Sequence, residues 1–148
     1  MENPAPRRPI RRRIGLLSLA GLVALGALSG CLKQQQDLTL HYLNRDRRAH
    51  TMSSLHRSSA YSERAQDHAW QMATSGRLFH STLRAGGSVC AMGENVAYAG
   101  SVGSAHRALM NSAGHRANIL NPRYDTAGIG VIRHAGLYWV VQLFVDRC

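Results

Sequence analysis

The sequence predicts an α+β fold, a three-layer α-β-α sandwich with an antiparallel sheet. Two observations carry the prediction. Helical spacing of apolar residues occurs ahead of residue 113, whereas residues 127–145 are rich in β-branched and aromatic side chains. The last strand expected, 137–145, is apolar on both faces, so both faces of the sheet need a cover. Helices that precede a sheet covered on both sides are the elements of such a sandwich.

The first thirty residues have the pattern of a signal peptide. Five arginines between Arg7 and Arg13 form a basic head, and residues 14–28 are apolar or small and uncharged. This run is shorter than the ~20 apolar residues that a helix needs to cross a bilayer. It ends in Leu28-Ser29-Gly30-Cys31, which resembles the lipobox of bacterial lipoproteins. An ordinary secretory signal and twin-arginine export are the alternatives.

The lipobox resemblance implies that residues 1–30 are removed and that Cys31 receives diacylglycerol and palmitate. Residues 31–37 would then be a lipidated cysteine with a short polar tether, and residues 38–148 one domain. The chain would lie on the outer membrane of a Gram-negative cell, or on the outer face of the plasma membrane of a Gram-positive one. Membrane is therefore the first partner that we expect.

Charge fits this localisation. Residues 1–30 hold five arginines and Glu2, so their removal leaves +6 of the net charge of +10. An exported domain with this balance is attracted to anionic lipids or wall polymers, and nucleic acid is not expected as a partner. Arg45, Arg47 and Arg48 are expected on a solvated helix face, with a partner-binding patch as the alternative.

Three helices are expected. The first spans 38–49, with Asp37 as N-cap. The second carries one apolar face from Tyr61 to Ala73, with Ser58 or Ser59 as N-cap and Gly76 at its end. The third spans 102–112 and is broken by Ala113-Gly114. Residues 51–59 and 78–99 show no sustained period and are expected to be loops.

A β-hairpin is expected at the end of the chain. Residues 127–133 and 137–145 form its strands, and His134-Ala135-Gly136 forms its turn. The second strand is the one with two apolar faces. One of these faces consists of Trp139, Val141 and Leu143, and the other of Tyr138, Val140 and Phe144.

With Cys31 lipidated, Cys90 and Cys148 are left as a pair. In an oxidising compartment such a pair often forms a disulfide, and closing so long a loop adds ~4 kcal/mol on the chain-entropy model. The alternative is that Cys90 is a catalytic thiol, although no activating side chain adjoins it in the sequence.

Three motifs follow one another in the second half of the chain. Phe79-His80-Ser81 comes after the second helix, and Gly93-Glu94-Asn95-Val96-Ala97 comes next. The third is Gly114-His115-Arg116-Ala117-Asn118-Ile119-Leu120, which Gly128-Ile129-Gly130-Val131 follows. Over residues 38–145 these motifs closely resemble the bacterial branch of the CAP superfamily, whose domains are also called SCP-like.

This resemblance implies an α-β-α sandwich and a central cleft with histidines and acidic residues. His80, Glu94 and His115 match the cleft positions, and in some members the cleft binds a divalent metal. Imidazole is a good ligand for zinc and nickel, so one of these is the metal expected in this chain. Asn95, Ser112, Arg116 and Asn118 are expected to support the cleft. The second glutamate of the eukaryotic pattern falls at or near Ser112, so one acidic ligand is missing.

Three functions are compatible with these residues. The first is a binding module for a small amphiphile, a wall fragment or a protein partner. The second is a metal-assisted hydrolase of peptide or envelope polymer with Glu94 as general base. The third is an interaction module in which His80, Glu94 and His115 form a purely structural network. The sequence contains no Ser-His-Asp set that would indicate another hydrolytic mechanism.

Overall fold

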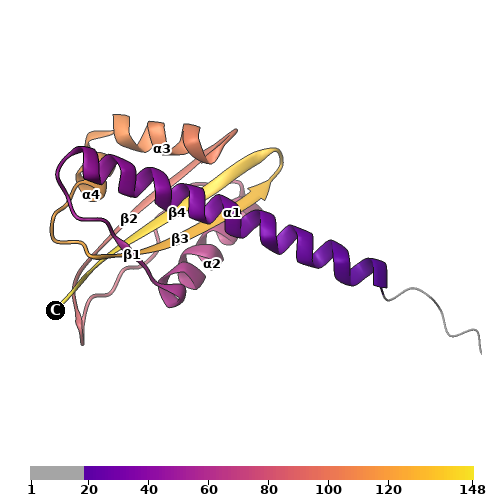
Figure 1. The fold of residues 1–148 in the computed structure, drawn as a ribbon, viewed down its shortest axis with the longest axis horizontal. Coiled ribbons are helices and arrows are strands. Elements are labelled where there is room, and N and C mark those ends of the chain that lie inside the picture. The colour runs from indigo at the N-terminus through magenta and orange to yellow at the C-terminus, as the bar shows by residue number, and fades with distance from the viewer. Residues whose placement is uncertain (1–18) are drawn as a thin grey trace, which may run out of the picture.

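The computed structural model describes residues 19–148, and Figure 1 shows its elements. The predicted signal peptide lies mostly outside the described residues. No helix within residues 19–148 is long and apolar enough to span a membrane. The elements, in order, are α1 (Leu19–Ala49), β1 (His56–Arg57), α2 (Ser59–Ser75), β2 (Val89–Ala99), α3 (Val102–Asn111), α4 (Ala113–Ile119), β3 (Thr126–His134) and β4 (Leu137–Arg147).

The four strands form one sheet in the order β1-β3-β4-β2. The pairs β3–β4 and β4–β2 are antiparallel, and the two-residue β1 pairs with β3 in parallel. Helices α1, α3 and α4 bury one apolar cluster against one face, and α2 buries a second cluster against the other. The predicted three-layer α-β-α sandwich is therefore confirmed, with β4 covered on both sides.

Helix α2 lies with its backbone directly on β3. A Cβ atom at Gly130 would come 2.1 Å from the carbonyl oxygen of Ala65, and one at Gly128 would come 2.4 Å from that of Tyr61. Only glycine permits this approach. The Gln66 side chain then pairs with Val131 as a strand would: its oxygen accepts from the Val131 N–H and its nitrogen donates to the Val131 carbonyl, both at 2.9 Å.

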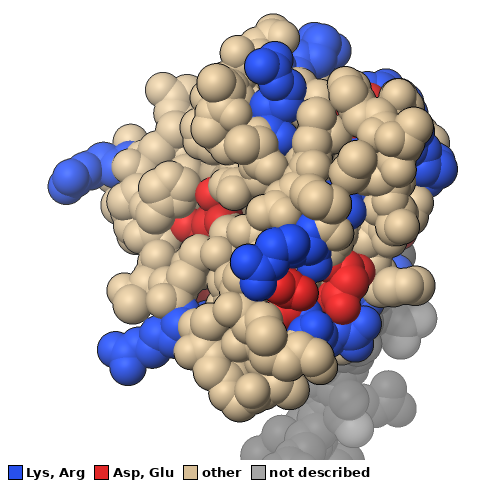
Figure 2. Space-filling view, turned by 90° about the vertical axis from the view of Figure 1, so that its left-hand side faces the viewer, with Lys and Arg blue, Asp and Glu red and all other residues tan. Residues whose placement is uncertain are grey.

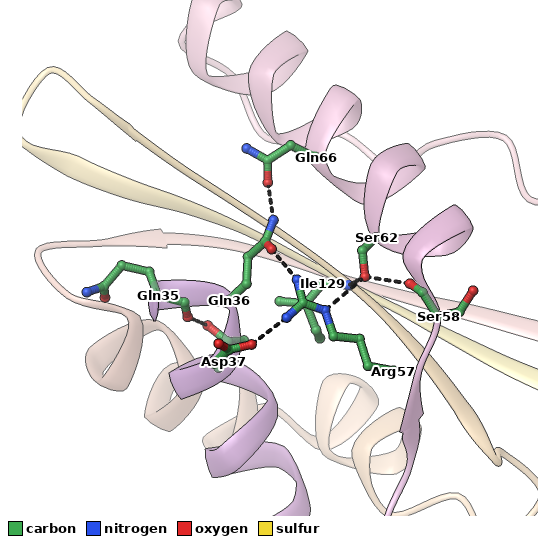
Figure 3. A network of polar contacts seen from close by, with 9 residues as sticks. Gln35, Gln36, Asp37, Arg57, Ser58, Ser62, Gln66 and Ile129 are labelled. Carbon is green, nitrogen blue, oxygen red and sulfur yellow. Dashed lines mark hydrogen bonds and ion pairs between the residues drawn. The ribbon is translucent and has the colours of Figure 1, made fainter. Parts of the chain in front are cut away.

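Helix α1 is longer than the sequence predicts. The expected start at Leu38 with Asp37 as N-cap is wrong, because the helix already includes residues 19–37. The expected tether 31–37 is thus helical, and it is attached to the domain. Arg57 donates to Gln36 and Asp37, and Gln36 donates to Gln66 at 2.7 Å (Figure 3).

Arg47 is buried, so the expectation of a solvated arginine face is wrong at this position. The guanidinium donates to the backbone carbonyls of Ser53, Ile119, Asn121 and Tyr124, at 2.7 to 3.1 Å. Burial lowers the pKa of Arg47. These bonds connect the end of α1 to the C-terminal end of α4 and to the turn that leads into β3.

His106 connects α3 to α1. Its side chain is buried and its Nε2 donates to Asp46 at 2.9 Å, while the ring stacks on Tyr42. The other ring nitrogen, Nδ1, is buried without a hydrogen-bond partner among the described residues. His106 therefore holds two helices together and does not point toward Glu94.

The remaining elements partly match the prediction. The α2 caps Ser58 and Gly76 and the β3–β4 hairpin are confirmed. The expected loops were wrong at two places: 51–59 contains β1, and 78–99 contains β2. Both are strands whose pairing with distant residues, not their own pattern, makes them extended. The break after α3 is confirmed, but a second helix, α4, begins at once.

A disulfide joins Cys90 to Cys148, which confirms the predicted pairing. It holds the end of β4 to the beginning of β2, and the N–H of Cys148 donates to Ser88 at 3.0 Å.

At the end of the molecule where Cys148 lies, Figure 2 shows basic side chains that stand apart and acidic ones beside some of them. Ion pairs here join Arg123 to Asp146 and Arg147 to Asp125. No broad surface of one sign results on this face.

Replacing Gly130 by alanine should destabilise the protein strongly, because the new methyl group meets the α2 backbone. We expect the free energy of unfolding to fall by about 3 kcal/mol, in the range of overpacked cores. Urea unfolding measures it. Gly114→Ala is the control, since a Cβ there meets nothing within 4 Å and alanine favours helix. Equal stability of the two variants would contradict the close contact.

Stability should increase with pH as His106 loses its proton. Burial lowers the pKa of His106, and the bond to Asp46 offsets this only in part, so the unfolded chain binds the proton more readily. Burial alone would raise the pKa of Asp46, but the bonds from Arg45 and His106 lower it overall. The free energy of unfolding should therefore rise with pH up to the ordinary histidine value of about 6.5.

Urea unfolding across about pH 5 to 7 tests this dependence. His106→Gln should flatten the slope, because glutamine does not titrate. His134→Gln is the control, since His134 is exposed in the hairpin. If His106→Gln retains the full slope, another group is responsible.

Candidate functional site

Glu94 on β2 lies at the centre of the first polar cluster. Its side chain is only 1% exposed, and it accepts three hydrogen bonds that replace its contact with water. Nδ1 of His80 donates to Oε1 at 2.9 Å, the backbone N–H of Ser81 donates to Oε1 at 2.8 Å, and the Ser81 hydroxyl donates to Oε2 at 2.6 Å. The segment after α2 is therefore bound to the sheet by one carboxylate.

His80 is the exposed member of this cluster. Its side chain is 58% exposed, and its Nδ1 is held by Glu94, so Nε2 is the ring nitrogen available to a ligand. Two large apolar side chains just ahead of it, Leu78 and Phe79, are exposed as well. The segment thus presents one imidazole beside apolar surface.

His68 is a neighbour of Glu94 that the sequence did not identify as a site residue. It is buried on α2, its Nε2 donates to the Phe79 carbonyl at 2.8 Å, and the same nitrogen lies 3.9 Å from Glu94 Oε2. Its ring also packs edge-on against Phe79. A histidine next to the apolar stripe of α2 was the only sequence indication of this role.

A second polar cluster surrounds Asn95, the next residue on β2. Its Nδ2 donates to the backbone carbonyl of His115 at 3.0 Å and to the Gln142 side chain at 3.2 Å, and its Oδ1 accepts from Asn118. Gln142 is fully buried in β4, and its Nε2 has no partner among the described residues. The sequence indication was a single amide in the apolar run 140–144.

The two clusters lie on opposite faces of the sheet. Side chains alternate along a strand, so Glu94 points toward α2 while Asn95 points toward α4. The partners agree: His68 belongs to α2, and His115 and Asn118 belong to α4. Asn118 also donates to the Glu94 carbonyl at 3.4 Å, which connects the two clusters through the backbone.

The third predicted cleft residue, His115, is not bonded to the other two in the described structure. Its Nδ1 shares a 2.8 Å hydrogen bond with the Ser112 hydroxyl. Ser112 lies between α3 and α4, and its carbonyl accepts from the Arg116 N–H. The exposed Arg116 side chain donates to Met110 at 3.5 Å. Asn95, Ser112, Arg116 and Asn118 thus lie in α4, at its start or against it. Of the residues predicted for the site, His80 is the one that bonds the Glu94 carboxylate.

A divalent metal does not fit this arrangement of side chains. Among residues 19–148, no three His, Cys, Asp or Glu side chains are grouped as a metal would require. Both Glu94 oxygens already accept hydrogen bonds, and the position of a further acidic ligand is Ser112. This geometry therefore gives no basis for a zinc- or nickel-dependent step.

Two hollows lie in the seam between α1 and α2, away from Glu94. A polar groove of about 580 Å³ contains the Arg57 network of Figure 3 and is lined by Lys33, Gln36, Arg57, Ser59, Ser62, Glu63, Gln66 and Asp67. A more apolar pocket of about 350 Å³ is lined by Cys31, Leu32, Trp70, Ile132 and Arg133. Sequence spacing gave no indication of either, because both depend on how α1 crosses α2.

Comparison with known structures supports the fold. The chain is 25% identical to an extracellular protein with an SCP domain from Bacillus anthracis, with a TM-score of 0.63 over 80% of this chain and 41% of that one. An outer surface protein of Borrelia burgdorferi gives a TM-score of 0.70 at 16% identity, over 78% of this chain and 95% of that one.

A more distant likeness is to venom allergen-like protein 4 of Schistosoma mansoni, with a TM-score of 0.61 at 10% identity, over 77% of this chain and 89% of that one. The chain thus spans less than half of the Bacillus protein and most of the other two. Comparison with curated protein sequences gave no match.

The family model of the cysteine-rich secretory protein family, CAP, matches residues 40–144, which include β1, β2, β3, most of β4 and both polar clusters. The match covers nearly all of the domain, and its fold agrees with that of the solved SCP-domain protein. This chain belongs to the CAP family.

Proposed function

We propose that this chain is an exported CAP-domain protein that a lipid on Cys31 tethers to the cell envelope, and that binds a small amphiphile at the surface around His80. Two features support the tether. Cys31 is exposed and free, and it follows the lipobox-like Leu28-Ser29-Gly30. The other two cysteines are paired in a disulfide, which is typical of oxidising compartments.

The observation that carries the binding proposal is the pairing of His80 with exposed apolar side chains. A buried carboxylate fixes the imidazole, so its free nitrogen is offered in one orientation. Leu78 and Phe79 are 44% and 40% exposed directly ahead of it. A molecule with a polar group and an apolar part matches this surface. Its polar group would hydrogen-bond to His80, and its apolar part would pack against Phe79.

The geometry supports binding better than catalysis. A general base needs a free oxygen within reach of the proton that it removes. Glu94 is buried, and its oxygens accept from His80 and from the Ser81 N–H and hydroxyl. His115, which would complete a hydrolytic set, bonds Ser112 instead. Glu94 is therefore better suited to hold His80 than to activate water.

The binding proposal predicts that His80 is needed for amphiphile binding and not for folding. We expect a short-chain phospholipid, kept below its micelle concentration, to shift the amide resonances of residues 78–81 in a saturable NMR titration. His80→Ala should weaken binding about tenfold, as for loss of a hydrogen bond to a charged group. His134→Ala, at an exposed histidine of the hairpin, should leave binding unchanged.

The same titration with a soluble peptidoglycan fragment tests the wall-fragment alternative. Shifts at residues 78–81 with that fragment alone would replace the amphiphile as ligand. Zinc or nickel titration tests the hydrolase alternative: saturable one-site binding that is lost in both His80→Ala and His115→Ala would contradict the proposal.

Glu94 should contribute to stability through its hydrogen bonds. Glu94→Ala leaves the Ser81 N–H and hydroxyl and the His80 ring without their acceptor, so the free energy of unfolding should fall by about 3 kcal/mol. Glu63→Ala removes an exposed carboxylate of α2 and should change it by less than about 0.5 kcal/mol. Urea unfolding compares the two. A Glu94→Ala protein of unchanged stability would favour a catalytic role for the carboxylate.

A further inference from the structure

Helix α1 connects Cys31 to the domain without a flexible segment. Residues 31–37 are helical, and the Gln36 and Asp37 side chains are bonded to Arg57 and Gln66 across the seam with α2. Figure 1 shows α1 continuing straight out of the domain beyond this point. Any anchor at Cys31 therefore determines which face of the domain is nearest to the membrane.

That face is apolar around the anchor position. Cys31 itself lines the pocket of about 350 Å³, together with Leu32, Trp70 and Ile132. Trp70 is 55% exposed, more than the other large apolar side chains that are exposed among the described residues. Tryptophan is enriched at membrane–water interfaces, because its ring prefers the headgroup region.

Basic side chains border this apolar surface. Arg133 lines the pocket, and Lys33 lines the adjoining groove two residues beyond Cys31. Both are exposed, so they can reach lipid phosphates. The acidic residues of the seam, Glu63 and Asp67, line the polar groove and not the pocket. An apolar surface with two cations at its border is complementary to a phospholipid headgroup layer.

We propose that the face formed by Cys31, Leu32, Trp70, Ile132 and Arg133 rests directly on the bilayer. Trp70 enters the headgroup region, and Arg133 and Lys33 contact phosphates. This inference rests on the proposed anchor at Cys31. It goes beyond tethering, because the domain is held in one orientation.

Quenching of tryptophan by brominated lipids tests this orientation. The full chain is bound to vesicles of phosphatidylcholine and phosphatidylglycerol in a Trp139→Phe background, which leaves Trp70 as the single tryptophan. Trp139 is buried and its Nε1 has no partner among the described residues, so phenylalanine loses no hydrogen bond there. The matched reporter is Trp70→Phe with His50→Trp, about 28 Å from Cys31 at 1.5 Å per helical residue.

We expect several-fold stronger quenching at Trp70 than at the position-50 reporter. Arg133→Glu should reduce Trp70 quenching in vesicles with phosphatidylglycerol, whereas Arg123→Glu, at the end of the molecule where Cys148 lies, should not. Equal quenching at the two reporter positions, or none at Trp70 in vesicle-bound protein, would overturn the proposal. Self-association in ultracentrifugation that Trp70→Ala abolishes would overturn it too, since a second copy would then cover this face.

Failure of the anchor can be told apart from failure of the orientation. Protein made in bacteria should float with vesicles in a density gradient and carry acyl chains, and Cys31→Ser should lack them. If the acyl chains are absent, the Cys31 thiol of the full chain is coupled to a maleimide lipid, since the other two cysteines are paired. The quenching comparison then tests the membrane face independently of biological acylation.

Discussion

The buried guanidinium of Arg47 is the interaction on which the arrangement of the site depends. A buried charge is costly unless hydrogen bonds replace its water, and four backbone carbonyls do so here. One of them is that of Ile119, the last residue of α4. Arg47 thus fixes the C-terminal end of α4, while Asn95 bonds the His115 carbonyl and the Asn118 side chain of the same helix. Neither contact alone would orient so short a helix.

The family motif on β2 serves two faces because its residues are consecutive. Alternation in a strand sends Glu94 to the α2 layer and Asn95 to the α4 layer. Gly93, just before them, leaves room for the Tyr124 hydroxyl, which would lie 2.6 Å from a Cβ atom. Three successive residues therefore join the segment after α2, the sheet and α4. The motif is therefore mainly structural. The exposed side chain that it positions is the imidazole of His80, which Glu94 holds.

Sequence patterns predicted the elements that carry their own periodicity or caps. Helix α2, bounded by Ser58 and Gly76, and the final hairpin are of this kind. The family resemblance further led to Glu94 and His80, which do meet. Strand β2 escaped prediction because its partners lie some fifty residues away, and its Gly-Glu-Asn centre has no strand propensity.

The other misses have similar physical reasons. Arginine is usually a surface residue, and only four backbone carbonyls, three of them within residues 119–124, make the burial of Arg47 favourable. His68 and Gln142 are polar residues at the margin or centre of apolar runs, and their partners come from other elements. Spacing along one chain cannot show that Glu94 and His115 belong to different sides of a sheet.

The position of β4 has a consequence for the order in which the protein can be assembled. It is the last strand in the sequence, yet it lies between β3 and β2 and provides the covered centre of the sheet. The Cys90–Cys148 bond likewise needs the final described residue. No sheet beyond the two-residue β1–β3 pair can form until β4 has emerged. On an export route that carries the chain unfolded, β1, β2 and β3 would therefore cross the membrane before the sheet can form, and these segments would still be extended as they cross.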